Sequence, residues 1–148
     1  MSKQLKLKIV TPERLVLEEM VDQVTIPTTE GEITVLPEHI PLIAGLKSGD
    51  IVAVANGEHI PFAVVGGFVE VNKDAENKTT VAILADFAEH VSDLSEEVVN
   101  KAKIRAQELQ TESIHKDDVD FEHFVTELER SLTRVKIADK WRNKKYRK

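Results

Sequence analysis

Cysteine is absent from all 148 residues, and its absence excludes several kinds of site. Without a thiol, the chain cannot form disulfides, thiolate zinc sites, iron–sulfur clusters or a cysteine nucleophile. Motifs that carry other chemistry are missing as well: there is no G-x-S-x-G, no G-x-G-x-x-G, no Walker-type glycine loop and no H-E-x-x-H. The sequence therefore carries no recognisable catalytic machinery, and we expect neither a metal site nor a cofactor.

Long apolar runs are also lacking. No run approaches the ~18–20 residues that span a bilayer, and the lysines near the start are not followed by the continuous apolar core of a signal peptide. The composition, with 41% hydrophobic and 31% charged residues, is that of a globular protein. We therefore expect a folded chain without a transmembrane segment.

Glycine and proline are missing from the second half of the chain. All six glycines and all five prolines precede residue 70. Because both residues mark turns and are disfavoured inside helices, this count divides the chain into a turn-rich part and a helical part. We place the boundary at residue 88, with one domain at 1–88 and a second at 89–148.

The first domain has the pattern of many short β-strands. Lys6 and Lys8 alternate with apolar residues, as in a strand with one buried face. Comparable runs recur at a spacing of about 8–12 residues, with turn signals between them. This spacing predicts an antiparallel sandwich or barrel, with a bulge or sharp turn at Gly66-Gly67.

The second domain has the pattern of two helices that form an antiparallel hairpin, with a connector at 111–118. Ser92, Asp93 and Ser95 are candidate N-caps of the first helix. Its predicted apolar stripe is Leu94, Val98, Ala102, Ala106 and Leu109. The second helix is predicted to begin at Asp117, Asp118 and Asp120 and to have an apolar face made of Phe121, Phe124, Val125, Leu128, Leu132, Val135 and Ala138. Ordering the backbone costs ~1–2 kcal/mol per residue, which the few apolar side chains of this hairpin barely offset. We therefore expect the hairpin to pack on another surface and, because it would be weakly docked, to be a candidate moving part.

Charge is distributed unevenly along the chain. Residues 1–90 hold 7 Lys/Arg and 14 Asp/Glu, residues 91–129 hold 4 and 11, and residues 130–148 hold 9 and 1. The basic extension at 140–148 also carries Trp141 and Tyr146. This asymmetry predicts a negatively charged partner, which is either an acidic protein surface or a nucleic acid.

Several motifs resemble one known family. The run EGEITVLPEHIPLIAGLKSGDI, which begins at Glu30, resembles the hallmark segment of the epsilon subunit of F-type ATP synthases. FAVVGGFVEV and TTVAILADFAE resemble later strands of that family, and KAKIRAQE and DVDFEHFVTELERSLTRVKIA resemble its two helices. The resemblance implies an N-terminal antiparallel β-sandwich of about ten strands followed by a C-terminal two-helix antiparallel hairpin.

The same resemblance implies a function and a set of partners. It implies a non-catalytic rotor subunit of the central stalk, peripheral to the cytoplasmic face of the bacterial inner membrane, that couples c-ring rotation to the catalytic head. The sandwich would bind the gamma subunit and the polar loops of the c-ring. The hairpin could extend into the α/β hexamer and inhibit ATP hydrolysis.

Site residues follow from matching positions. Glu30, Glu32 and His39 match the residues that face the c-ring. The basic residues that match or extend the contacts of the inhibitory helix with the head are Arg130, Arg134, Lys136 and Lys140.

The sequence departs from the family pattern in two places. Thr34 and Glu38 stand where the family usually has glycine. Some members bind ATP through an I/L-D-x-x-R-A motif in the first helix, and here the aspartate is replaced by Ser95 and the arginine by Val98, after a retained Leu94. We therefore predict that ATP binding is weak or absent.

Two other functions fit the same sequence. A nucleic-acid-binding module could use the basic tail, whose aromatic rings would stack on bases. A sandwich that binds a small ligand, with no rotor partner, is the second alternative. The resemblance favours the rotor subunit, with no nucleic acid among its partners.

Overall fold

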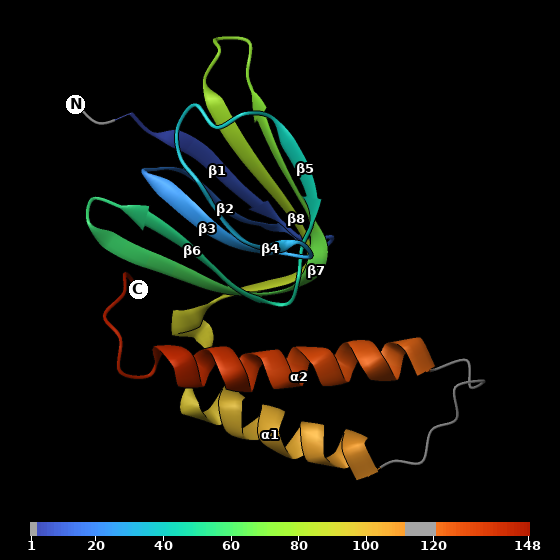
Figure 1. Cartoon of the computed structure of the whole chain (residues 1–148). Coiled ribbons are helices and arrows are strands. Elements are labelled where there is room, and N and C mark those ends of the chain that lie inside the picture. Colours follow the sequence, from blue (N-terminus) through green and yellow to red (C-terminus); the bar gives the residue numbers. More distant parts are fainter. Residues whose placement is uncertain (1–2, 112–120) are drawn as a thin grey trace.

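The computed structural model describes residues 3–111 and 121–148, which form a β-sandwich with two helices against one end (Figure 1). The elements are β1 (Leu5–Val10), β2 (Leu15–Val21), β3 (Gln23–Thr28), β4 (Gly31–Val35), β5 (Leu42–Gly45), β6 (Gly49–Ala55), β7 (Glu58–Lys73), β8 (Thr79–His90), the 3-10 turn η1 (Val91–Asp93), α1 (Glu96–Thr111) and α2 (Phe121–Trp141). The predicted sandwich and helices are confirmed.

The strands form one continuous sheet that folds over on itself. Their order is β2-β1-β8-β7-β6-β3-β4, and β5 pairs with β7 outside this path. Pairing is antiparallel except between β1 and β8, which run parallel. Alternate residues of β1 point inward, so Leu5, Leu7 and Ile9 are fully buried in the main core while the two lysines between them are exposed.

Eight strands stand where about ten were expected, because β7 and β8 are long. The first part of β7 pairs with β6 and its last part pairs with β5, so β7 serves both halves of the fold. Gly66 and Gly67 mark the change of direction, with φ of +60° and +113°. The register with β8 is the same on both sides of this pair, so of the two predicted alternatives the bulge is wrong, and the strand turns here without an inserted residue.

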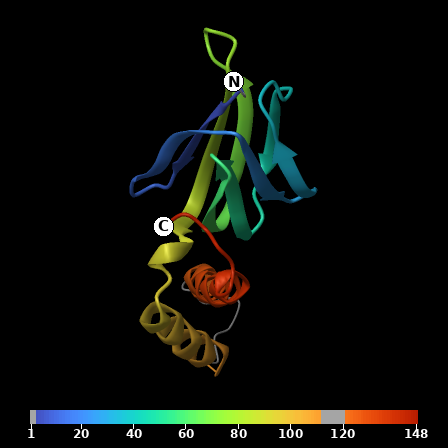
Figure 2. The same cartoon turned by 90° about the vertical axis from the view of Figure 1, so that its left-hand side faces the viewer.

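The two helices are stacked beneath the sandwich, with α2 between the strands and α1 (Figure 2). α2 contacts β6, β7 and η1, whereas α1 packs chiefly on α2. The apolar stripe predicted for α1 is largely confirmed, since Ala102, Ala106 and Leu109 are buried. Ser95 is the N-cap that forms, because its Oγ accepts a hydrogen bond from the Val98 amide at 3.3 Å.

The apolar face predicted for α2 is wrong in part. Val125 is 43% exposed and Leu132 is 44% exposed, although both belong to that face. The residues of α2 that are buried instead are Ser131, Thr133, Ile137 and Trp141. α2 lies between α1 and the sandwich. Small polar side chains of α2 are buried where the helix approaches these two surfaces closely, and part of its apolar stripe remains exposed to solvent. The predicted start of this helix at Asp117, Asp118 and Asp120, and the connector beyond Thr111, lie outside the described residues.

No helix among residues 3–111 and 121–148 is both long and apolar enough to cross a membrane.

Candidate functional site

The interface between α2 and the sandwich brings together several of the basic residues singled out in the sequence. Arg134 Nε donates a hydrogen bond to Glu89 Oε2 at 3.1 Å, near the end of β8, where the Glu89 side chain is only 17% exposed. The guanidinium carbons of Arg134 and Arg130 lie 4.9 and 5.1 Å from the centre of the Phe87 ring. Both arginines therefore lie against the aromatic face of Phe87 on β8, and Arg134 also pairs with a carboxylate of the same strand.

A second contact lies at the C-terminal end of α2. Lys140 Nζ is 2.8 Å from Asp50 Oδ2, and the indole Nε1 of Trp141 donates to the same oxygen at 2.9 Å. The Asp50 side chain is 10% exposed and Trp141 is 4% exposed. Because a buried carboxylate needs partners, these two donors are what allows Asp50 to lie under the helix.

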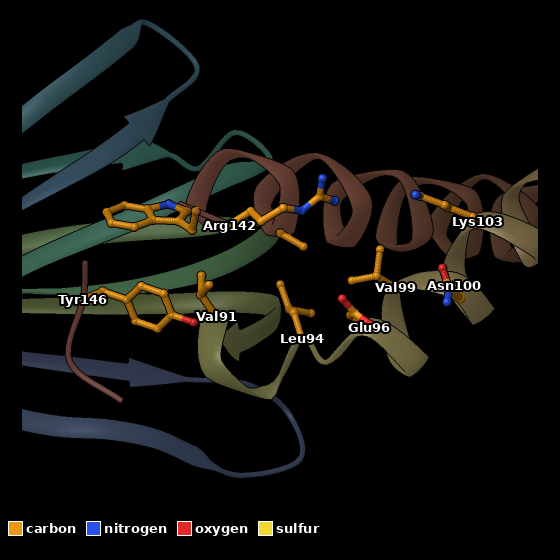
Figure 3. A pocket seen from close by; sticks show the side chains of 10 residues that line it. Val91, Leu94, Glu96, Val99, Asn100, Lys103, Arg142 and Tyr146 are labelled. Carbon is orange, nitrogen blue, oxygen red and sulfur yellow. The ribbon is translucent and has the colours of Figure 1, made fainter. Parts of the chain in front are cut away.

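A small hydrophobic cluster surrounds this contact and is separate from the main core. Its buried members are Ala63, Val91, Ile137 and Trp141, and Leu94, Val52 and Tyr146 pack around them. Tyr146 lies beside Val91, with Leu94 further along the same hollow (Figure 3). The cluster joins β7, η1, α2 and the residues after α2.

The helices are joined to each other by a bidentate ion pair. Arg105 Nε and Nη2 donate to the two carboxylate oxygens of Glu127, at 2.6 and 3.1 Å. The hydrogen bond from Arg105 lowers the pKa of Glu127. α1 and α2 are thus linked by charge as well as by the alanine-lined stripe, which suits a hairpin that keeps its own structure.

Lys136 is the basic site residue that differs from the others. It is exposed, and among the described residues it makes neither an ion pair nor an aromatic contact, whereas Arg130, which also lacks an ion pair there, lies against the Phe87 ring. It lines a shallow hollow together with Lys140, Asp50 and Glu32. Lys136 therefore adds positive charge to the surface beside the β3–β4 turn.

The three residues matched to c-ring contacts do not form one cluster. Glu30 lies in the turn before β4, Glu32 lies on β4 and both are exposed, whereas His39 lies in the loop after β4. The strand, at ~3.3 Å per residue, separates the carboxylates from the imidazole. His39 is held locally, by a contact of its Nδ1 with the Ile40 carbonyl oxygen at 2.7 Å.

The segment that matches the family's ATP motif has a structural role here. Ser95 caps α1, and Glu96 and Glu97 occupy its first turn, where carboxylates are favoured by the helix dipole. The nearby hollow is lined by residues of both charges, including Glu96, Lys103 and Arg142 (Figure 3). Two carboxylates at the helix start disfavour a phosphate there.

Sequence reasoning missed the sandwich residues that receive the helices and the tail. These are Glu19, Asp50, His59 and Glu89, which lie on four different strands. Each is an ordinary polar residue of a strand, and no local pattern distinguishes it. Only the folded arrangement brings them under the basic end of the chain.

Known proteins resemble the chain both in sequence and in structure. The β-sandwich domain of the ATP synthase delta/epsilon chain matches residues 4–91. The ATP synthase epsilon chain of Nitratidesulfovibrio vulgaris is 42% identical over 137 residues, covering 93% of this chain and 97% of its own length. The ATP synthase epsilon chain of Herpetosiphon aurantiacus is 36% identical over 140 residues, covering 95% of this chain and 98% of its own length.

Chains of two solved ATP synthase structures are also similar to this chain. A chain of the Euglena gracilis mitochondrial ATP synthase, in a structure of OSCP, F1 and the c-ring, superposes with a TM-score of 0.64 at 26% identity, covering 85% of this chain and 76% of that chain. A chain of the Tetrahymena thermophila mitochondrial ATP synthase central stalk and c-ring has a TM-score of 0.54 at 18% identity, covering 95% and 98%, which shows a shared fold.

Proposed function

Because the chain belongs to the ATP synthase epsilon-chain family, we propose that it is a non-catalytic central-stalk subunit that couples c-ring rotation to the catalytic head and whose helices restrain ATP hydrolysis. The subunit would be peripheral to the cytoplasmic face of a bacterial inner membrane. The observation that carries the restraint is the polar interface of α2. Its cations are held by Glu89 and Asp50 in the docked state, and acidic surfaces of the head would compete for the same cations.

The sandwich would serve as the fixed part of this subunit. Ile43, Phe68 and Leu84 are 74%, 63% and 53% exposed, and pairing of β5, β7 and β8 puts them on one outer face of the sheet. An exposed apolar patch of this kind marks a docking surface. We assign it to the gamma subunit, and the Glu30–Glu32 turn and His39 to the polar loops of the c-ring.

The docked and released states differ in what α2 contacts. In the docked state, Arg134 and Lys140 pair with the sandwich. In the released state, these two side chains, together with Arg130 and Lys136, would face the α/β hexamer. Only a partner with different affinity for the two states can shift the balance, and an acidic head surface meets that condition because it binds the freed cations.

The test is removal of the second helix from the assembled enzyme. Deleting the chain from Asp118 onward should raise the rate of ATP hydrolysis while proton-driven ATP synthesis is retained. A matched variant, with Lys136→Glu and Arg130→Glu in the full chain, should raise hydrolysis by weakening the contact with the head. If hydrolysis is unchanged in both, the restraint is refuted and coupling alone remains.

The nucleic-acid alternative has less support. Tyr146 packs in the small cluster and Arg147 is paired with Glu19, so two of the tail residues that would bind a nucleic acid already contact the sandwich. Co-purification with a gamma-like subunit distinguishes the two functions. A Phe68→Glu variant should lose that co-purification if the apolar patch is the docking surface.

A further inference from the structure

The seven residues after α2 turn back to the sandwich. The Lys144 amide donates to the Trp141 carbonyl oxygen at 3.2 Å, which closes a turn at the end of the helix. The chain then runs beside the strands, with its C-terminal end next to the sandwich (Figure 1). We call residues 142–148 the C-terminal strap.

The strap is tied to two strands by Arg147. The Arg147 amide donates to the His59 carbonyl oxygen on β7 at 2.8 Å. Its Nη2 donates to Glu19 Oε2 on β2 at 2.6 Å, and each side chain is 33% exposed. One backbone bond and one charged bond thus fix the end of the strap, and the Glu19 contact raises the pKa of Arg147.

An aromatic contact fixes the middle of the strap. The Tyr146 ring lies 5.9 Å from Trp141, edge to face, and 6.1 Å from His90. Trp141 also meets the His59 ring edge to face at 6.0 Å. Tyr146 beside Val91 closes one side of the small cluster (Figure 3), so the strap covers the same apolar group that holds α2 to the sandwich.

The position of these contacts gives the strap a mechanical consequence. α2 lies on the sandwich through a few polar contacts and one small cluster, and α1 is carried on its outer side. The strap leaves the end of α2 and binds the sandwich again beyond it, at β2 and β7. The C-terminal end of α2 therefore cannot separate from the sandwich unless the contacts of Arg147 and Tyr146 with the sandwich also break.

We propose that the C-terminal strap is a latch that holds the helical hairpin on the sandwich and so sets how often the hairpin is released. The inference rests on the proposed function only where it concerns the effect of hairpin release on ATP hydrolysis in the assembled enzyme. The latch itself is a property of the isolated chain. The ligand of the strap is the sandwich of the same molecule, through the Glu19 carboxylate, the His59 carbonyl and the small cluster.

The latch is tested by a distance measurement in the isolated full-length chain. The chain has no cysteine, so Glu76→Cys on the β7–β8 loop and Thr126→Cys on α2 give a unique pair of spin labels. The parent should show one narrow distance distribution. Arg147→Glu should add a longer distance and raise the ratio of released to docked molecules by up to roughly fivefold, the range for a partly exposed ion pair. Deleting residues 142–148 should raise the ratio further.

Two controls make the result specific. Lys145→Glu introduces the same charge change two residues earlier, on an exposed side chain without an ion pair among the described residues, and should leave the distribution unchanged. The charge swap Glu19→Arg with Arg147→Glu should restore the docked distance. Unchanged distances in both Arg147→Glu and the deletion would overturn the latch.

Failure of the latch and failure of the proposed function have different outcomes. If the strap variants release the hairpin in the isolated chain but hydrolysis by the assembled enzyme stays at the parent rate, the restraint is wrong and the latch stands. If deletion from Asp118 raises hydrolysis but the strap variants leave the distances unchanged, the restraint stands and the latch is overturned.

Discussion

Replacing Asp50 by alanine should undock the helices without unfolding the sandwich. Asp50 accepts hydrogen bonds from Lys140 Nζ and from the Trp141 indole. The Lys140 side chain is 42% exposed, so this ion pair contributes at most ~1 kcal/mol. Trp141 is 4% exposed, and leaving its buried N–H without an acceptor costs ~1–3 kcal/mol. The two terms together amount to ~1–4 kcal/mol, and a value of about 2 kcal/mol within that range corresponds to a roughly thirtyfold rise in the ratio of released to docked molecules.

Trp141 also supplies the assay, because it is the only tryptophan in the chain. Release of α2 moves its indole from the small cluster into water, so the emission should shift to longer wavelength and become more accessible to acrylamide. Amide hydrogen exchange should quicken in α2 and stay slow in β1, β7 and β8, which reports undocking and not global unfolding.

The matched variant is Asp50→Asn. The asparagine carbonyl can still accept from the Trp141 indole, while the charge opposite Lys140 is lost. Its effect should therefore be less than ~1 kcal/mol, close to that of an exposed pair. Equal and large effects of Asp50→Asn and Asp50→Ala would show that the charge and not the indole acceptor decides docking. Unchanged Trp141 emission and α2 exchange in Asp50→Ala would refute the reasoning altogether.

Three further predictions follow from single features. Burial lowers the pKa of His90 below its ordinary 6.5. The neutral imidazole therefore stabilises the docked state at pH values above 6.5, and this stability is lost as the pH falls below ~6.5. Trp141 emission should accordingly shift on acidification in the parent but not in a His90→Gln variant. Gly67→Ala should lower the melting temperature of the sandwich, because the added Cβ would lie 2.0 Å from the Leu84 carbonyl oxygen and the residue has φ of +113°. Calorimetry with ATP should show no micromolar binding, since Ser95 and Val98 replace the motif's charged residues; restoring both as Ser95→Asp and Val98→Arg tests that explanation.

The parts of the fold that depend on local patterns could be predicted from the sequence. Alternation of lysines and apolar residues in β1 predicts which side chains are buried, because side chains on a strand point to opposite faces in turn. The alanines of α1 likewise mark its contact with α2. The strand count could not be predicted, because the sequence does not show whether the chain breaks at Gly66-Gly67 or bends through it.

The candidate site was less accessible from the sequence, for a physical reason. A charged interface depends on which two surfaces meet, and the sequence shows only one of them at a time. Arg134 could be singled out from its match to the family pattern and Lys140 from the basic end of the chain, yet their partners Glu89 and Asp50 are two of the many carboxylates of the strands. The apolar stripe of α2 was misleading for the same reason, since Leu132 is apolar and nevertheless remains outside the packed face.

The composition of the interface between α2 and the sandwich is consistent with the proposed reversible restraint of ATP hydrolysis. A broad apolar contact would hold α2 at ~25 cal/mol per Å² buried, with no partner able to displace it except by offering an equally large apolar surface. Here the apolar part is confined to a small cluster around Ile137 and Trp141, and the rest consists of ion pairs, hydrogen bonds and arginines against the Phe87 ring. Carboxylates on another subunit can replace Glu89 and Asp50 at little net cost, because each cation exchanges one charged partner for another. The exposed Val125 and Leu132 then offer that subunit an apolar contact which the docked state leaves unused.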